Sequence, residues 1–250
     1  MNKIKLTLVA VSLVFSQLAS AITVDEIIDG SIEATGGSEA WSKLKGIKFT
    51  AEGSQGPMKF PIEMVQLADG RTYMQFSIQG KQLRQNVFDG ETVWSTNMMT
   101  MKAEKQSAET IANIKLDAND FPFSLFNYKA KGYKAELLGK EELDGSEVYK
   151  VRLTKEPISV DGKKVESVEY HYFDVDSLVE LATETEVRQG PGKGTIMMTK
   201  VSDYDEVDGL YFPFSISQSA KGGQQFFTLQ MKKIELNPKV DAAQFKLPKE

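Results

Sequence analysis

His171 is the first residue to consider for catalysis, because it is the single histidine of this 250-residue chain and the chain contains no cysteine. A serine nucleophile would need His171 as its base, yet the sequence has no G-x-S-x-G turn to carry that serine. Alternation along the segment 165–174 places His171 on one strand face with Ser167 and Glu169. That polar face predicts a solvated, dispensable histidine, and we expect no catalytic residue.

Two other segments resemble ligand-binding loops but lack the required spacing. The acidic run "DYDEVDG" (203–209) does not have the 1-3-5 pattern and final glutamate of a calcium loop. The run "RQGPGKGT" (188–195) lacks the phosphate-loop pattern, and no helix is expected after it. Both are typical of hairpin connections. With no HExxH motif either, we predict no metal site and no cofactor; a carboxylate pair for glycoside hydrolysis stays possible among the 35 acidic residues.

The N-terminus has the pattern of a secretory signal peptide. Lys3 and Lys5 precede the apolar run "LTLVAVSLVF", and "ASA" (19–21) supplies the small residues of a cleavage site. This predicts cleavage after Ala21 and one mature domain over 22–250, in a bacterial periplasm. An uncleaved anchor is the alternative.

The overall charge argues against two kinds of partner, nucleic acid and anionic membranes. The formal charge of −5 becomes −7 once Lys3 and Lys5 are removed, and no Lys/Arg-rich run stands out. A nucleic-acid partner is therefore not expected, and the acidic balance argues against electrostatic binding to anionic membranes.

Repeated Asp-Gly pairs predict a sheet made of hairpins. They lie at 69–70, 89–90, 144–145, 161–162 and 208–209. Asp-Gly favours the tight turns that join antiparallel strands, and the segments between the pairs alternate apolar and polar side chains. We count about eleven strands in a long antiparallel meander. Pro213 lacks a backbone donor, so its strand is expected near an edge or at a bulge.

Helices should be few. Thr23 and Glu26 form a capping box before the first helix, and Ser38 is expected to cap a short second helix that carries Trp41. A third helical region is expected around 107–128, interrupted by Pro122. The predicted fold is mainly β (α+β): a curled antiparallel half-barrel covered by helices.

Methionine and aromatic side chains recur on one face of the predicted strands. Methionine adapts its shape and suits a cavity that accepts varied apolar chains, although ordinary core packing is the alternative for each residue. The predicted cavity-lining residues are Met58, Phe60, Ile62, Met64, Met74, Phe76, Ile78, Trp94, Met197, Phe212 and Phe214.

Several stretches, in order, resemble the LolA/LolB-like family of bacterial outer-membrane lipoprotein-sorting proteins. They are "TGGSEAWSKLKGIKFTAEG", "FDGETVW", "FPFSLFNYKAKGY", "VYKVRLT", "YHYFDVDSLVE", "YDEVDGLYFPFS" and "KKIELNPKVDAAQFKLP". The resemblance implies a helix-covered half-barrel around a hydrophobic cavity, with no catalytic residues. It also implies a buried arginine that controls a lid, and no arginine here matches it.

The resemblance leads to two hypotheses of different classes. The first is a soluble periplasmic carrier that binds acyl chains of lipoproteins or lipids for transfer toward the outer membrane, with inner- and outer-membrane transfer partners. The alternative is a periplasmic sensing or scaffold module that binds an envelope protein. The missing lipid-bearing cysteine favours the soluble shuttle over an anchored acceptor.

Overall fold

The computed structural model describes residues 21–188 and 192–248. The predicted leader peptide lies almost wholly in residues 1–20, outside the described residues. Within the described part, no helix is long and apolar enough to cross a membrane.

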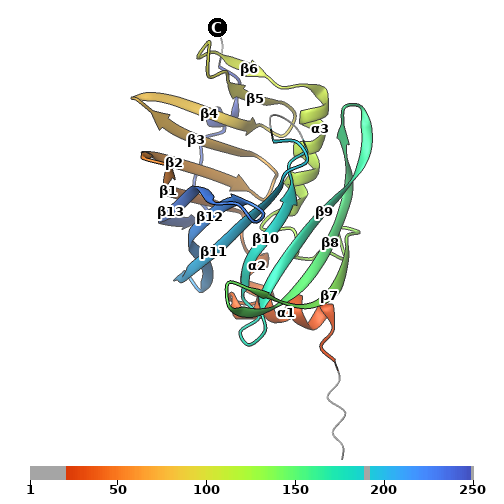
Figure 1. Ribbon diagram of the computed structural model, residues 1–250. Coiled ribbons are helices and arrows are strands. Elements are labelled where there is room, and N and C mark those ends of the chain that lie inside the picture. The colour runs from red at the N-terminus through yellow and green to blue at the C-terminus, as the bar shows by residue number, and fades with distance from the viewer. Residues whose placement is uncertain (1–20, 189–191, 249–250) are drawn as a thin grey trace, which may run out of the picture.

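Thirteen antiparallel strands form one strongly curved sheet (Figure 1). Its order is β6-β5-β4-β3-β2-β1-β13-β12-β11-β10-β9-β8-β7, so the first and last strands of the chain meet in the middle. The bounds are β1 Gly46–Gln55, β2 Met58–Leu67, β3 Thr72–Ile78, β4 Lys81–Phe88, β5 Val93–Thr96, β6 Ala103–Lys105, β7 Lys134–Leu143, β8 Ser146–Val160, β9 Lys163–Asp174, β10 Glu180–Glu186, β11 Ile196–Val207, β12 Leu210–Ala220 and β13 Gln225–Leu236.

The expected mainly-β fold is therefore confirmed, while the expected strand number was too low. The three-residue strand β6 is too short for alternation to reveal it. All five Asp-Gly pairs join neighbouring antiparallel strands, as predicted. At Asp208-Gly209, both residues have positive φ (50° and 85°), the conformation of a tight hairpin turn.

Within the described residues, three α-helices accompany the sheet, and their bounds follow from local capping. Helix α1 (Val24–Ala34) has the expected capping box between Thr23 and Glu26. Helix α2 (Ser38–Ser42) is capped by Gly37 and not, as expected, by Ser38. Helix α3 (Ala108–Asp117) is capped by Ser107 and continues into the short 3-10 helix η1 (Ala118–Asp120). A second 3-10 helix, η2 (Ala242–Phe245), follows the last strand.

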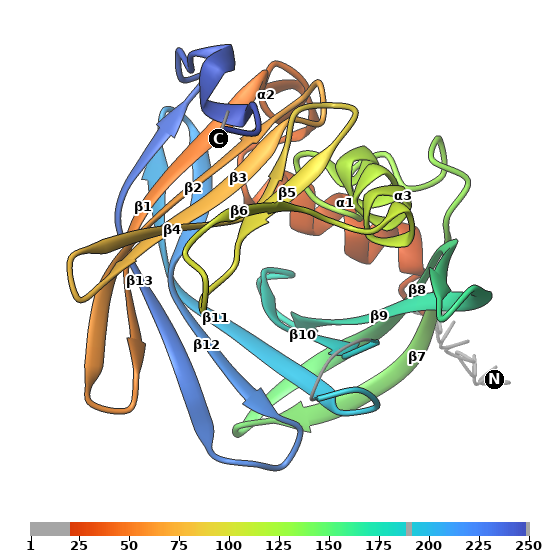
Figure 2. The ribbon, with the colours of Figure 1, turned by 90° about the horizontal axis from the view of Figure 1, so that it is seen from above.

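The main core lies on the concave face of the sheet, beneath α1 and α2 (Figure 2). Ile27 and Ile28 of α1 are fully buried there, because the apolar stripe of the helix faces inward. Trp41 of α2 packs edge-on against Phe212 of β12, with ring centroids 5.1 Å apart. The helices thus cover the concave face, as the sequence predicted.

The aromatic stretch Leu210–Phe214 at the start of β12 alternates between the two faces of the sheet. Leu210 and Phe212 are buried in the main core, whereas Tyr211 is 40% exposed on the other face. The ladder between β12 and β13 begins only at Ser215, so Pro213 lies where β12 has no partner on that side. The backbone N–H of Tyr211 donates instead to the carbonyl oxygen of Thr35, at 3.0 Å. The expectation that this strand lies near an edge or at a bulge was wrong, because β12 is an interior strand between β13 and β11; Pro213 is accommodated because the β12–β13 ladder starts only after it.

The convex face carries two smaller apolar clusters. One includes Val65, Tyr73 and Trp94, covered by Phe245 of η2. The indole Nε1 of Trp94 donates to the carbonyl oxygen of Phe245 at 3.0 Å. Trp94 is therefore on the opposite face from the cavity, and its predicted place in the cavity lining was wrong.

Candidate ligand cavity and its buried ionic network

Apolar side chains on the concave face are only half-buried where the helices do not cover them. Phe60, Met64, Met74, Phe76 and Phe214 pack against the edge of the main core and stay partly accessible. The rings of Phe60 and Phe76 lie 6.0 Å apart across strands β2 and β3. Since a closed core would bury these side chains, the concave face keeps an open apolar surface.

The remaining predicted lining residues have varied positions. Ile62 and Phe212 are fully packed in the core, and Met58 is 51% exposed at the β1–β2 turn. Ile78 and Met197 are half-buried near other turns of the sheet. The structure thus brings Phe60, Met64, Met74, Phe76 and Phe214 together as accessible surface, and uses Ile62 and Phe212 as support.

A pocket of about 390 Å³ opens where this surface meets the segment that follows α3. Met64 and Met74 form its sheet side, and Ile114, Phe121 and Phe123 form its helix side. The volume is within the range of ~300–1,000 Å³ that is usual for small-molecule sites. A second groove continues from Met74 and Phe76 to the β5–β6 turn.

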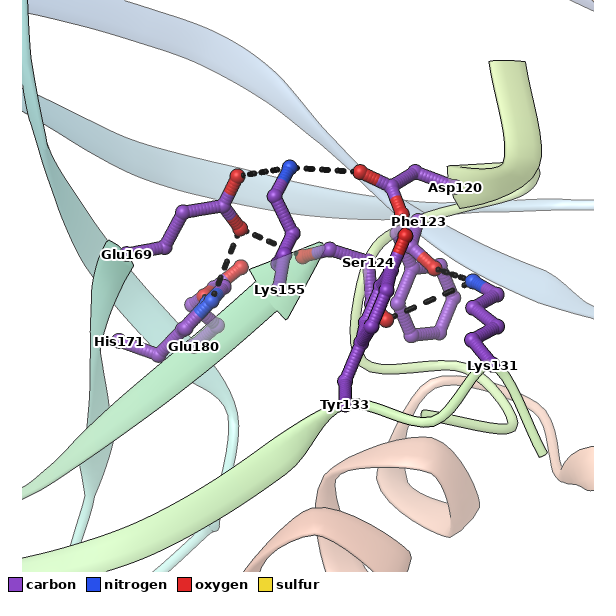
Figure 3. Close-up of polar contacts among 9 residues, drawn as sticks. All are labelled: Asp120, Phe123, Ser124, Lys131, Tyr133, Lys155, Glu169, His171 and Glu180. Carbon is purple, nitrogen blue, oxygen red and sulfur yellow. Dashed lines mark hydrogen bonds and ion pairs between the residues drawn. The ribbon is translucent and has the colours of Figure 1, made fainter. Parts of the chain in front are cut away.

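A buried ionic network fixes the segment 118–124, which we call the cover loop, to the sheet (Figure 3). The Nζ atom of Lys155 on β8 lies 2.7 Å from Asp120 Oδ2 and 2.6 Å from Glu169 Oε1. The Ser124 hydroxyl donates to Glu169 Oε2 at 2.8 Å, and the Tyr133 hydroxyl donates to Asp120 at 2.9 Å. Both ends of the cover loop are therefore held by the same cluster of charges.

His171 extends this network along β9. Its Nδ1 is 2.5 Å from Glu180 Oε1, and its Nε2 is 3.3 Å from Glu169 Oε2, outside hydrogen-bond geometry. The Tyr204 hydroxyl donates to the carbonyl oxygen of Glu180 at 2.9 Å. Because carboxylates face both ring nitrogens, the imidazole is placed as a cation between anions.

The charges in the network hold one another in their ionised forms. Burial lowers the pKa of His171, but the charge of Glu180 and the contacts with Glu169 outweigh it and raise the pKa to about 9. Burial also opposes the charge on Glu169, yet His171 and Lys155 lower the pKa of Glu169 to about 2. The pKa of Lys155 is raised, because Glu169 and Asp120 outweigh its desolvation. At neutral pH all three side chains are charged.

The expectation of a solvated His171 was wrong. His171 is 4% exposed, on the same concave face as Val151 and Phe173. The alternation along β9 was read correctly, but the polar face is the inner one. Tyr170 and Tyr172 face outward, where the Nζ atom of Lys150 lies 5.2 and 5.0 Å from their ring centroids.

Sequence reasoning missed Lys155, Asp120 and Glu180 as members of the site. Alternation could have placed Lys155 on the face of Leu153, but only the strand register brings Glu169 opposite Leu153. The polar groups of the network contact one another: the Ser124 hydroxyl donates to Glu169, and carboxylates face both ring nitrogens of His171. This geometry supports a role in binding and in positioning the cover loop. Within residues 21–188 and 192–248, no group of three acidic or histidine side chains could hold a metal ion.

Comparison with known proteins identifies the fold of this chain. No protein-family model matches the sequence, and no curated protein matches it either. Among solved structures, a LolA superfamily protein from Nitrosomonas europaea superposes with a TM-score of 0.52 at 12% identity, covering 90% of this chain and 98% of that one. A putative outer membrane lipoprotein-sorting protein domain from Vibrio parahaemolyticus has a TM-score of 0.52 at 10% identity, covering 88% of this chain and 94% of that one. The curved sheet, the helices over its concave face and these two full-length superpositions together show that the chain has the LolA-like fold.

Proposed function

We propose that this protein is a periplasmic carrier that binds acyl chains of lipoproteins or lipids in the concave cavity. The observation that carries the proposal is the half-buried surface of Phe60, Met64, Met74, Phe76 and Phe214, which continues into the pocket of about 390 Å³. The LolA-like fold of a lipoprotein-sorting protein domain supports it by analogy.

The energetics favour an acyl ligand. Each methylene removed from water contributes ~0.8 kcal/mol, so about ten buried methylenes contribute about 8 kcal/mol before the costs of association. Methionine on both sheet strands of the pocket can adjust to chains of different length. A carrier must release its cargo, and an adaptable lining meets that need better than a rigid one.

Binding of a fluorescent fatty-acyl probe tests the proposal. The wild-type protein should bind the probe, and Phe76→Glu should weaken binding by at least about tenfold, because the carboxylate would have to lose its water when a chain enters. Phe76 is half-buried, so the variant should keep its circular dichroism spectrum. Leu138→Glu is the matched control, since Leu138 is 51% exposed on β7.

Two outcomes would contradict the carrier. One is a wild-type protein that binds no acyl probe at all. The other is protein purified from the periplasm with a stoichiometric protein partner and no acyl lipid detectable by mass spectrometry. The second result would favour a sensing or scaffold module.

A further inference from the structure

Basic residues gather along one edge of the sheet although they are scattered in the sequence. In an antiparallel meander, alternate turns lie at the same ends of the strands. We use "edge" here for such a row of strand ends and turns. One edge is formed by the turns β1–β2, β3–β4, β5–β6, β8–β9, β10–β11 and β12–β13. We call it the basic edge. The described residues of these turns and of the two positions on either side include three acidic residues, Glu104, Asp161 and Glu186, and eight basic ones: Lys59, Lys81, Lys102, Lys163, Lys164, Arg188, Lys193 and Lys221.

The opposite edge has the reverse charge. It is formed by the turns β2–β3, β4–β5, β7–β8, β9–β10 and β11–β12. With their flanking positions, these turns carry one basic residue, Arg71, and eleven acidic ones: Asp69, Asp89, Glu91, Glu142, Asp144, Glu147, Asp174, Asp176, Glu180, Glu206 and Asp208. The net charge of −5 therefore conceals two oppositely charged edges.

Large apolar side chains project at the same turns as the lysines. Met58 is 51% exposed beside Lys59, and Phe226, near the start of β13, is 45% exposed next to the β12–β13 turn that holds Lys221. In the β5–β6 turn, Met98 and Met99 are 63% and 91% exposed. Figure 2 shows the β1–β2, β3–β4 and β12–β13 turns following one another along the rim of the curved sheet.

Part of the positive charge is not neutralised by neighbouring acids. Four of the eight basic side chains are ion-paired: Lys59 with Glu52, Arg188 with Glu186, Lys193 with Asp161 and Lys221 with Glu184. Within the described part of the chain, no ion pair is formed by Lys81, Lys102 or Lys163, which are all exposed. These three lysines lie in three different turns and can meet external anions.

We propose that the basic edge docks on the surface of an anionic phospholipid bilayer, with the exposed apolar side chains entering the interface. Alternating cationic and apolar tips suit a bilayer surface, because the apolar groups enter the headgroup region while the lysines stay at the phosphates. The acidic edge is repelled by the same surface and points away from it. The proposal departs from the expectation, drawn from net charge alone, that electrostatic binding to anionic membranes is disfavoured.

Docking in this orientation also presents the apolar groove to the bilayer. That groove is lined by Met74 and Phe76 at one end and by Met98 and Met99 at the basic edge. An acyl chain could pass along it between bilayer and cavity without crossing open water. This step rests on the proposed carrier function, whereas docking itself does not.

Vesicle sedimentation tests the docking. The wild-type protein should bind vesicles of phosphatidylglycerol mixed with phosphatidylethanolamine and should not bind vesicles of phosphatidylcholine alone. Added salt should weaken the binding. The triple variant Lys81→Gln, Lys102→Gln and Lys163→Gln should bind about a hundredfold more weakly. The control Lys43→Gln, Lys45→Gln and Lys239→Gln changes the net charge equally at exposed lysines outside the basic edge and should bind like wild type.

Tryptophan fluorescence tests the orientation. Trp41 and Trp94 are both buried, so anionic vesicles should leave their emission unchanged. A change in emission caused by the vesicles then reports on a tryptophan added at the surface. Met99→Trp should shift to shorter wavelength with those vesicles. Tyr211→Trp, at an exposed position on the acidic edge, should not.

Three results would overturn the proposal: no binding to phosphatidylglycerol vesicles, equal loss of binding in the two triple variants, or an equal shift at both tryptophan positions. Binding to an acidic protein but not to vesicles would also overturn it. The fatty-acyl probe should bind equally well to the wild type and both triple variants. Failure of docking is thereby distinguishable from failure of the carrier function.

Discussion

Lys155 on β8 and Asp120 in the cover loop form a buried ion pair of 2.7 Å between groups 35 positions apart in sequence. Their side chains are only 10% and 16% exposed. The contact joins the segment that borders the pocket to the middle of a long strand. The cover loop is thus attached by charge as well as by the packing of Phe123 on Trp41, whose ring centroids are 5.1 Å apart.

Replacing Lys155 by methionine should destabilise the protein strongly. The change leaves Asp120 and Glu169 buried without their common cation, and breaking a buried pair in this way costs about 3–5 kcal/mol. Urea denaturation at neutral pH measures the loss. Lys59→Met is the matched control, because its pair with Glu52 is on the surface and should contribute little. Equal stability of the two variants would contradict the structural role of Lys155.

His171 should make the stability depend on pH on the alkaline side. Its pKa is raised from 6.5 to about 9 in the folded protein, so its contribution is complete below pH 6.5 and is lost as the pH rises through 9. The free energy of unfolding of the wild type should therefore fall between these two values. His171→Gln should be less stable at neutral pH and should lose most of this slope. A variant that retains the wild-type slope would show that another group titrates.

The strand β9 shows what sequence reasoning can and cannot determine. Alternation correctly separated Glu169 and His171 from Tyr170 and Tyr172, because side chains of a strand must point to opposite faces. It could not tell which face is inward, since the usual rule assigns aromatic rings to the core. Here pairing with Lys155 and Glu180 lets the charged side chains occupy the concave face.

The same limit applies to Trp94 and to the lysines of the basic edge. Trp94 looked like a cavity residue because large apolar side chains are usually placed in one core, yet this sheet buries apolar groups on both faces. Lys81 and Lys163 are 82 positions apart in the sequence, and only the order and direction of the strands place both at the same edge. The Asp-Gly turns, in contrast, were predictable because their conformation is local.

Secretion stays a prediction from the sequence alone. N-terminal sequencing of the mature protein from the periplasm should begin at Ile22, as the "ASA" site requires. Ile22 packs against the main core just before the capping box of α1, so cleavage there removes nothing from the helix. Recovery of protein that starts at Met1 in the membrane fraction would contradict this prediction.

Phe212 and Phe76 should separate folding from binding. Phe212 is 5% exposed and packs on Trp41 and Phe49, so Phe212→Ala should leave a cavity and lower the free energy of unfolding by about 3–5 kcal/mol. Phe76 is half-buried at the open concave surface, so Phe76→Ala should cost clearly less stability. Its effect should fall on the affinity for a fluorescent fatty-acyl probe, because Phe76 lines the groove that reaches Met99. Urea denaturation and probe titration of both variants give the comparison. If Phe76→Ala proved as destabilising as Phe212→Ala and left probe affinity unchanged, the concave face would be a packed core and not a binding surface.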